Sequence, residues 1–306
     1  IAFLEQIIDE VLNIFDNVFI HLGGDECPRT RWETCPKCQK RIKDEGLSST
    51  SQLQCWFTRH FAQYLESKGR RLVGWDEVLD GYLDFPKSTV IMQWRSAAAG
   101  MAARRGYNVV VSPNFDLYLD FQQYQAPEHF EYGGGFITTH HIFHFNPAKE
   151  LSGLEQYLLG LQGNLWSEYM WERADLQWKA FPRAVAVAVS GWEEQGSKDW
   201  VRFMHDFAVK EKEALQQMGI NDAGLQYGEQ GGWKKGQLSG EYTTIEMSLT
   251  NSTNAKGNIE VAFVHTGGKH DVHVKNVKLL FNNVPVASDS HEGIINEVPQ
   301  NSLYSL

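Results

Sequence analysis

The sequence predicts an α/β protein in which a parallel sheet precedes a small all-β module. Over about residues 1–220, short apolar runs alternate with amphipathic helical stretches, which is the pattern of βα units. Residues 221–240 are rich in glycine and polar residues, as expected of a linker. Residues 241–306 carry short alternating runs without helical periodicity, which favours a small β-sandwich. Because the last run reaches Leu306, this module could be truncated.

Each element of the first part is assigned from its apolar pattern. The first helix has apolar residues from Ile1 to Leu12 on one face, and the chain begins inside it without a methionine. We therefore expect a fragment of a longer protein, which would not form an active enzyme alone. A second amphipathic helix ends near Gly69, and further helices are expected up to about residue 105 and at residues 174–190 and 198–218. Strands are expected at residues 18–21, 71–75, 89–94, 107–112 and 159–166, and in the later module at residues 243–249, 259–265, 272–281 and 284–287.

Composition and charge disfavour several classes of partner. The formal net charge of −10 argues against a nucleic-acid backbone or an anionic membrane surface as the main partner. No apolar run approaches the roughly 18 residues of a membrane span. Hydrophobic residues make up 42% of the chain, which is enough for a sizeable core. The ten tryptophans are mostly expected in that core, although an indole ring also stacks well on a sugar.

Two adjacent acids follow the first predicted strand. Asp25 and Glu26 come after Gly23 and Gly24, which let the backbone turn tightly and approach a ligand closely. In an α/β barrel, the carboxyl ends of the strands form the rim that displays catalytic groups. An Asp-Glu pair also suits the first turn of a helix, where the helix dipole favours negative charge. This segment alone therefore leaves catalysis and helix capping equally open.

Aromatic and acidic residues also follow the later strands. Tryptophan occurs at three strand ends, although the interior of a barrel prefers branched aliphatic side chains. Tryptophan walls with carboxylates make a pocket with apolar faces and polar edges, which suits a sugar ring. We therefore favour a carbohydrate site over a structural coincidence. Its further candidate residues are Trp75, Trp94, Tyr118, Asp120, Trp166 and Glu168, of which Asp120 could instead be a turn or cap residue and Trp94 a core residue.

These motifs resemble those of a known family. In order and spacing they are similar to the motif series of glycoside hydrolase family 20, the β-N-acetylhexosaminidases. The resemblance covers about residues 1–220, and residues 27–38 and 287–293 resemble the bacterial, Bacteroides-like members. The motifs are His21-Leu-Gly-Gly-Asp-Glu26, Gly74-Trp-Asp-Glu-Val78, Gln93-Trp94, Tyr118-Leu-Asp120 and Leu165-Trp-Ser-Glu168.

The resemblance implies a (β/α)8 TIM barrel, of which this chain would hold the C-terminal part, about strands four to eight. The family's amino-terminal domain and first three barrel strands would then lie outside the chain. Those strands supply an arginine that grips sugar hydroxyls and a histidine near the acid, so neither is assigned here. The resemblance also points to a periplasmic or secreted protein, while the oligomeric state stays open.

The resemblance further implies a reaction and a role for each site residue. The expected substrate is a glycan with a terminal non-reducing β-linked N-acetylglucosamine or N-acetylgalactosamine, whose own 2-acetamido oxygen is the nucleophile of a retaining reaction. Glu26 would be the acid/base, Asp25 would orient the acetamido group, and Tyr118 would hydrogen-bond its oxygen. No cofactor is expected. The sugar ring would be bound by walls from Trp75, Trp94 and Trp166 and by hydroxyl contacts from Asp120 and Glu168.

Two other functions are compatible with these residues. One is a carbohydrate-binding barrel without activity, which the intact Asp25, Glu26 and Tyr118 argue against. The other is a glycosidase that uses two protein carboxylates, namely Glu26 with Glu77 or Glu168.

The four cysteines leave three states open. Cys35 and Cys38 have the spacing of a zinc ligand pair, with Cys27 before them and Cys55 as a fourth candidate. A disulfide among Cys27, Cys35 and Cys38 suits an exported protein, and free thiols are the third alternative.

Residues 132–143 depart from the family in containing no tryptophan, so that Phe143 or a histidine would form that wall of the pocket.

Overall fold

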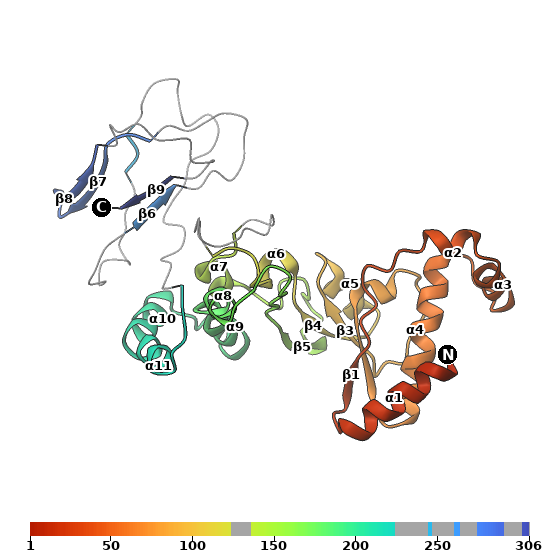
Figure 1. Cartoon of the computed structure of the whole chain (residues 1–306). Coiled ribbons are helices and arrows are strands. Elements are labelled where there is room, and N and C mark those ends of the chain that lie inside the picture. The colour runs from red at the N-terminus through yellow and green to blue at the C-terminus, as the bar shows by residue number, and fades with distance from the viewer. Residues whose placement is uncertain (124–135, 224–243, 247–259, 264–273, 291–301, 306) are drawn as a thin grey trace.

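A computed structural model shows a five-stranded parallel sheet with helices packed on it, followed by short antiparallel strand pairs (Figure 1). The structure describes the chain except for residues 124–135, 224–243, 247–259, 264–273, 291–301 and 306. The sheet strands are β1 (Phe19–His21), β2 (Arg71–Trp75), β3 (Val90–Gln93), β4 (Asn108–Val111) and β5 (Leu158–Leu161). The helices of this part are α1 (Ala2–Ile14), α2 (Thr30–Thr34), α3 (Pro36–Asp44), α4 (Thr50–Ser67), η1 (Asp76–Leu79), α5 (Ala98–Arg104), α6 (Asn114–Leu117), α7 (Thr139–His144), η2 (Glu155–Tyr157), α8 (Arg173–Ala180), α9 (Arg183–Trp192), α10 (Trp200–Asp206), η3 (Phe207–Glu211) and α11 (Lys212–Gln217).

The strands lie in the sheet in the same order as in the sequence, β1-β2-β3-β4-β5. Every neighbouring pair is parallel, from Phe19 paired with Arg71 to Val111 paired with Leu161. Parallel neighbours need a crossover connection, and α4 and α5 lie in two of these connections. Because all five strands run the same way, their carboxyl ends meet at one edge of the sheet. The residues that follow those ends are therefore brought together.

The two faces of the sheet are set by the alternation of side chains along each strand. Leu72, Ile91 and Val109 point to the face that packs against α4 and α5, in a core with Leu65 and Ala99. The alternate residues form a second cluster on the opposite face, composed of Val73, Trp75, Val90 and Met92 with Val110 and Trp94 packed against it. The strand-end tryptophans Trp75 and Trp94 thus continue the register of the inner face, and this places their rings at the rim.

A further core joins the segment after β4 to the last helices. It contains Leu119 and Phe121 together with Phe143 of α7, Ala186 of α9 and Phe203 of α10. Phe143 is only 1% exposed and its ring packs 5.1 Å from that of Trp200. The suggestion that Phe143 forms a wall of the sugar pocket is therefore wrong, because its ring is used inside this core.

Several predicted boundaries need correction. The strand expected over residues 159–166 ends at Leu161, because the chain beyond it bridges Tyr118 through Asn164 instead of continuing the sheet. The helix expected over residues 174–190 is two helices, α8 and α9, separated at Pro182, which lacks the N–H that an unbroken helix needs. The polar loop of residues 27–38 contains α2 and the start of α3, which has Pro36 in its first turn.

The later module is described only in part. It contains β6 (Glu260–Phe263) paired antiparallel with β9 (Ser302–Ser305), and β7 (Val277–Phe281) paired antiparallel with β8 (Val284–Asp289). These strands overlap three of the four predicted runs, whereas most of the run at residues 243–249 lies outside the described residues. Much of the expected linker, residues 224–240, also lies outside them.

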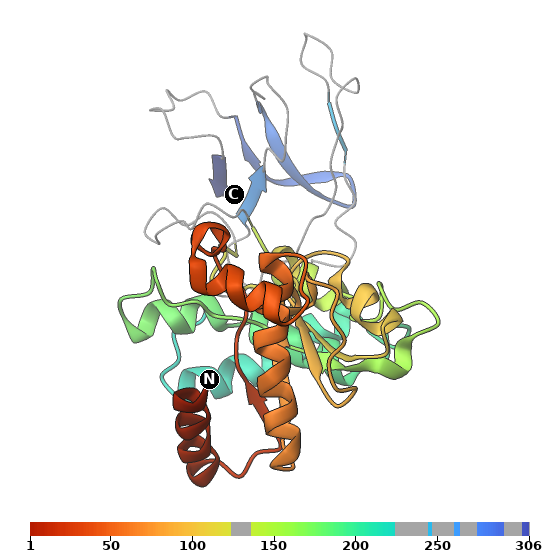
Figure 2. The same ribbon diagram turned by 90° about the vertical axis from the view of Figure 1, so that its right-hand side faces the viewer.

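Helices α1 and α4 lie side by side beside β1 (Figure 2). His60 Nε2 of α4 lies 2.7 Å from Glu5 Oε1, and Lys68 Nζ lies 2.9 Å from Asp9 Oδ1 of α1.

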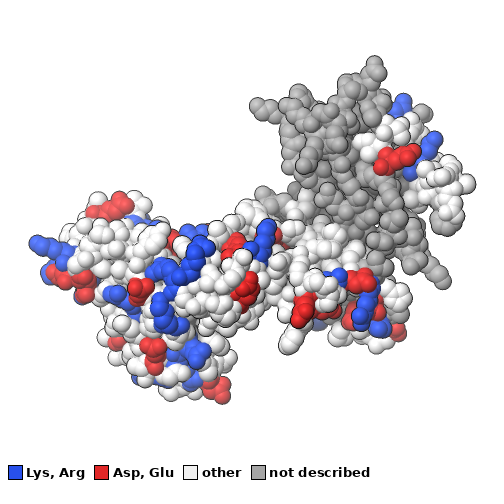
Figure 3. Space-filling model, turned by 180° about the vertical axis from the view of Figure 1, so that it is seen from behind, with Lys and Arg blue, Asp and Glu red and all other residues white. Residues whose placement is uncertain are grey.

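Acidic and basic side chains are intermixed on the face drawn in Figure 3. Among the described residues, no helix combines the length and the apolar character that crossing a membrane would require.

Stability is expected to decrease as the pH falls from about 6.5 towards 4, because of His140 in α7. Its ring lies 4.1 Å from that of His144 and 4.9 Å from that of Trp200. Burial, with the charge of His144 and His141, lowers the pKa of His140 from 6.5 to about 4. In this pH window the unfolded chain binds a proton that the folded chain does not, so acid favours unfolding. Urea unfolding at several pH values would measure the slope.

A matched pair of variants tests this prediction. His140→Asn should flatten the dependence between pH 6.5 and 4, because the group with the lowered pKa is gone. His205→Asn is the control for the loss of a histidine, since His205 lies on α10 with a side chain that is 67% accessible. An unchanged slope in His140→Asn would contradict the assignment.

Candidate active site

The turn after β1 carries the two adjacent acids and is held tightly against β2. The Leu22 N–H donates to the Val73 carbonyl and the Trp75 N–H donates to the Gly23 carbonyl, both at 3.0 Å. Gly24 has a φ of 105°, and a Cβ atom at this position would lie 2.4 Å from Val78 Cγ1. The close approach of the turn to the segment after β2 therefore requires glycine.

Helix α4 holds the same turn from the other side. The buried Gln54 side chain donates from Nε2 to the Gly24 carbonyl at 2.8 Å. Its Oε1 accepts a hydrogen bond of 2.5 Å from Arg29 Nη1, which lies just beyond the acids. The turn is thus fixed on both flanks, while Asp25 and Glu26 are exposed. Glu26 has a φ of 45°, and its N–H donates to Glu77 Oε2 at 3.0 Å.

A row of aromatic rings extends from β1 to the segment after β5. The rings of His21 and Trp75 have centroids 5.1 Å apart, and those of Trp75 and Trp166 are 6.1 Å apart. The ring of Tyr118 lies 5.7 Å from that of Trp166. These four residues come from four different strand ends. The structure therefore brings Trp75, Tyr118 and Trp166 together in one row, and it adds His21 to that row.

His21 belongs to the motif before the acids but was not singled out from the sequence. Its Nδ1 accepts a hydrogen bond of 3.0 Å from the Gly23 N–H. Burial lowers the pKa of His21, and the nearby charge of Asp25 opposes this effect. The position of His21 in the motif, only two residues before the turn, is the sequence signal that could have identified it.

Trp94 and Asp76 meet at the end of β3. Trp94 packs on the inner-face cluster that contains Trp75, and its buried Nε1 has no partner among the described residues. Its backbone N–H donates to Asp76 Oδ2 at 2.8 Å, and the Arg95 N–H donates to the same oxygen at 2.9 Å. The Arg95 guanidinium also pairs with Asp76 Oδ1. Asp76 is fully buried, and its hydrogen bonds hold the segment that carries Trp94 in place.

Tyr118 and Asp120 follow β4, and the ring of Tyr118 packs against that of Trp166. Burial is the main cause that raises the pKa of Tyr118 to about 12, although hydrogen bonding to Trp166 and Asn164 acts in the opposite direction. Tyr118 therefore keeps its hydroxyl proton at neutral pH and can donate a hydrogen bond. Burial also raises the pKa of Asp120, which is 8% exposed. Its Oδ1 is buried without a hydrogen-bond partner in the described part of the chain.

Two buried cations support the segment that carries Tyr118 and Asp120. Lys179 Nζ donates to the Asp120 carbonyl at 2.7 Å. Arg183 is fully buried, and its guanidinium donates to the carbonyls of Leu119, Ile137 and Lys179. Neither residue stands out in the sequence, since the only local feature of Lys179 and Arg183 is a place in the helices α8 and α9.

The remaining candidate residues, Glu168 and the cysteines, lie outside the row of aromatic rings. Glu168 is exposed two residues beyond Trp166. Cys27, Cys35 and Cys38 are free thiols, and Cys55 is buried with its Sγ 2.8 Å from the Val78 carbonyl. Across the described residues, no three His, Cys, Asp or Glu side chains gather in a way that could hold a metal ion. The zinc alternative for the cysteines therefore has no support there.

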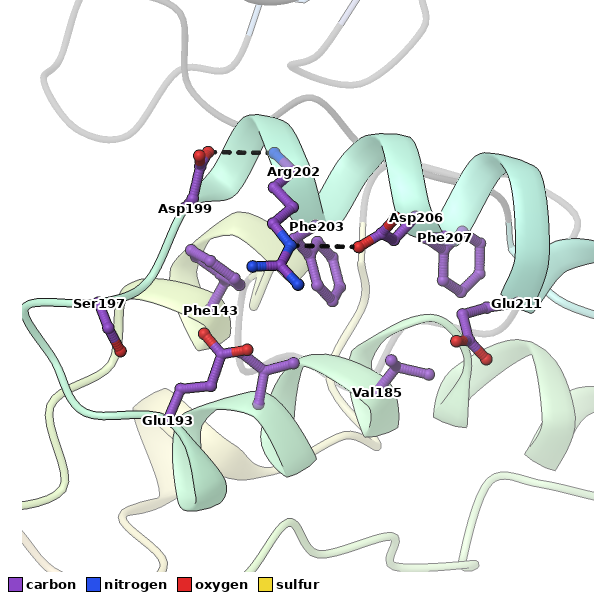
Figure 4. Close-up of a pocket in the computed structure, with 11 residues that line it drawn as sticks. Phe143, Val185, Glu193, Ser197, Asp199, Arg202, Phe203, Asp206, Phe207 and Glu211 are labelled. Atoms are coloured by element: carbon purple, nitrogen blue, oxygen red, sulfur yellow. Dashed lines mark hydrogen bonds and ion pairs between the residues drawn. The ribbon is translucent and has the colours of Figure 1, made fainter.

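A cavity of about 180 Å³ lies away from the acids, between α9 and the α10–η3 segment (Figure 4). Its lining includes Phe143, Val185, Arg202 and Phe203, but not Asp25, Glu26 or any ring of the aromatic row. The residues around Asp25 and Glu26 instead form an open rim. Within the described residues, β1 is an edge strand, so the sheet does not enclose this rim.

Comparisons with known proteins agree with this geometry. Residues 1–195 match the family described as glycosyl hydrolase family 20, catalytic domain. The chain is 38% identical over 205 residues to a β-hexosaminidase of Porphyromonas gingivalis, covering 66% of this chain and 26% of that protein. It is 35% identical to a β-hexosaminidase of Vibrio furnissii, covering 62% of this chain and 32% of that protein. The chain thus spans only about a quarter to a third of these relatives.

Solved structures show the same likeness. A family 20 exo-β-N-acetylglucosaminidase of Vibrio harveyi, in complex with N-acetylglucosamine, superposes with a TM-score of 0.67 at 29% identity, over 72% of this chain and 35% of that one. A β-N-acetylhexosaminidase of Bacteroides fragilis gives a TM-score of 0.65 at 28% identity, over 73% of this chain and 46% of that one. With the family matched over residues 1–195, this chain belongs to glycosyl hydrolase family 20.

Proposed function

We propose that this chain carries the acid/base half of the active site of a β-N-acetylhexosaminidase. The enzyme would remove terminal non-reducing β-linked N-acetylglucosamine or N-acetylgalactosamine from glycans. The observation that carries this proposal is the rim itself. The turn with Asp25 and Glu26 follows the strand next to Trp75, whose ring belongs to the row that reaches Trp166 and Tyr118.

The reaction would use the substrate's own 2-acetamido oxygen as nucleophile. Glu26 would protonate the glycosidic oxygen and then remove a proton from the attacking water. Asp25 would accept a hydrogen bond from the acetamido N–H, while the Tyr118 hydroxyl, which stays protonated at neutral pH, would donate to the acetamido oxygen. With its N–H and its oxygen both held, the acetamido group gains the advantage of an intramolecular attack. Trp75, Trp94 and Trp166 would form the walls, and Asp120 and Glu168 would bind hydroxyls.

The unpartnered oxygen of Asp120 supports its place in substrate binding. A buried polar atom without a partner is costly, and a sugar hydroxyl would satisfy it. The alternative with two protein carboxylates is less favoured for Glu77, because its Oε2 already accepts the Glu26 N–H. An inactive carbohydrate-binding barrel would not need the adjacent pair of acids.

The finer architecture is part of the same proposal. Sheet strands β1 to β5 would correspond to strands four to eight of a (β/α)8 barrel, since their order in the sheet follows the sequence. Residues 1–220 would form the catalytic portion, residues 221–240 a linker, and residues 241–306 a β-sandwich built around the strand pairs β6–β9 and β7–β8. The family resemblance supports export to the periplasm or secretion.

The proposal is tested by assaying the full-length protein on an aryl N-acetyl-β-glucosaminide. Hydrolysis with retention, and inhibition by the thiazoline analogue of the intermediate, are expected. The variant Asp25→Asn should lose kcat by about 10²-fold or more, because misplacing an internal nucleophile costs that much. Hydrolysis that resists the thiazoline would refute participation of the acetamido group, and absence of hydrolysis would refute the activity.

A further inference from the structure

We propose that Glu77 is a positioning residue that aims the acid/base Glu26 through its backbone. The inference rests on the proposed function, in which Glu26 moves the proton. In this role Glu77 does not contact the substrate. The role depends on one hydrogen bond, in which the Glu26 N–H donates to Glu77 Oε2 at 3.0 Å across 51 residues of sequence.

The backbone of Glu26 needs such a partner. Its φ of 45° lies in the left-handed region, where the Cβ atom of an L-residue is crowded by the following carbonyl. A residue stays in that region only when its surroundings hold it there. The direction of the Glu26 side chain depends on this φ, because the Cα–Cβ bond swings with the backbone. An acceptor for the N–H therefore fixes where the carboxyl group points.

Glu77 is itself mounted on a rigid frame. It lies in the single turn η1 that directly follows β2, between two buried residues, Asp76 and Val78. Asp76 is tied to the end of β3 by the backbone N–H groups of Trp94 and Arg95. Val78 packs against the Gly24 position of the acidic turn itself. The acceptor and the turn that it holds therefore move as one unit.

A carboxylate is a suitable acceptor at position 77 because it is ionised. A hydrogen bond from a peptide N–H to an ionised acceptor is about twice as strong as one between neutral groups. The rest of the turn is held by hydrogen bonds with Val73 and Gln54, and Glu77 accepts the hydrogen bond that comes from Glu26. A Cβ atom at Gly74 would lie 3.2 Å from Val78 Cγ1, so the glycine leaves room for η1 close to the acidic turn.

The test compares substrates with good and poor leaving groups on the full-length protein. Glu77→Leu should lower kcat/KM by about 10- to 100-fold on an N-acetylglucosaminide disaccharide, whose leaving group needs the proton of Glu26. On a dinitrophenyl N-acetylglucosaminide, which leaves without that proton, the loss should stay within about threefold. Inhibition by the thiazoline analogue should also stay near wild type, since the groups that bind it are untouched.

Two further variants keep the test sharp. Glu77→Gln retains an oxygen acceptor and should keep the wild-type leaving-group profile, whereas a catalytic carboxylate at this position would lose about 10²- to 10⁴-fold when converted to the amide. Glu150→Leu is the matched control. Glu150 Oε1 likewise accepts the N–H of a residue with positive φ, Ala97 at 64°, at 2.8 Å, and its Oε2 accepts from Gln93 Nε2 at 2.8 Å. It should leave the leaving-group profile unchanged.

The outcomes separate this inference from the proposed function. If the wild-type protein cleaves neither substrate, the proposed function fails. If the wild type is active and Glu77→Leu loses the same factor on both substrates, or none, the positioning role is refuted. It is equally refuted if Glu77→Gln is as impaired as Glu77→Leu. Should the leucine variant not fold, Glu77→Gln alone decides, since strong inactivation on every substrate would mark Glu77 as catalytic.

Discussion

Replacing Glu26 with alanine is expected to lower kcat/KM of the full-length protein on an N-acetylglucosaminide disaccharide by about 10²- to 10⁴-fold. The reason is that the exposed carboxyl group at the end of β1 would be the only proton donor for the leaving oxygen in the proposed reaction. On a dinitrophenyl substrate the first step needs no proton, so the loss there should be smaller. Steady-state kinetics on both substrates would measure the difference.

Azide rescue distinguishes the roles of the two adjacent acids. Added azide can attack the intermediate without a base, so Glu26→Ala should regain activity on the dinitrophenyl substrate. Asp25→Ala should not be rescued, because it would impair formation of the intermediate itself. Glu33→Ala, which removes an exposed acid on α2, serves as the control and should behave as wild type. Equal azide response in the Glu26 and Asp25 variants would contradict this division of roles.

Replacing Arg183 with methionine is expected to lower the free energy of unfolding by about 3–5 kcal/mol. Burial lowers the pKa of Arg183 to about 9, which means that keeping its charge in the folded state is costly. Methionine removes that cost and fills similar volume, but it leaves the carbonyls of Leu119 and Ile137 without their donor. Each unsatisfied buried polar group costs about 1–3 kcal/mol, so destabilisation should win.

Urea unfolding followed by tryptophan fluorescence would measure this loss. Arg202→Met on α10 is the matched control, because its side chain is 80% accessible and its ion pair with Asp206 spans 3.5 Å. That variant should remain within about 0.5 kcal/mol of wild type. The Leu119 carbonyl lies between Tyr118 and Asp120, so Arg183→Met should also weaken substrate binding. Stability equal to that of Arg202→Met would show that the carbonyls find other donors.

Much of the sheet could be predicted because its signals are local. The run from Arg71 to Trp75 was assigned with both ends correct, and the strands at 19–21, 90–93 and 108–111 were placed within one residue at each end. Alternation of side chains also explains the strand-end tryptophans, because Trp75 and Trp94 share the inner-face register of Val73 and Met92. The errors arose where a local pattern was interrupted, as at Pro182 and beyond Leu161.

The sequence by itself determined the family, the parallel sheet and the residues at its carboxyl edge, since these depend on short motifs and on the period of the strand. Only the tertiary structure decided which residues hold them. Asp76 meets Trp94, Glu77 meets Glu26 across 51 residues, and Lys179 meets the Asp120 carbonyl across 59. Such contacts join segments that become neighbours only when parallel strands bring their ends to one edge, and no local periodicity records them.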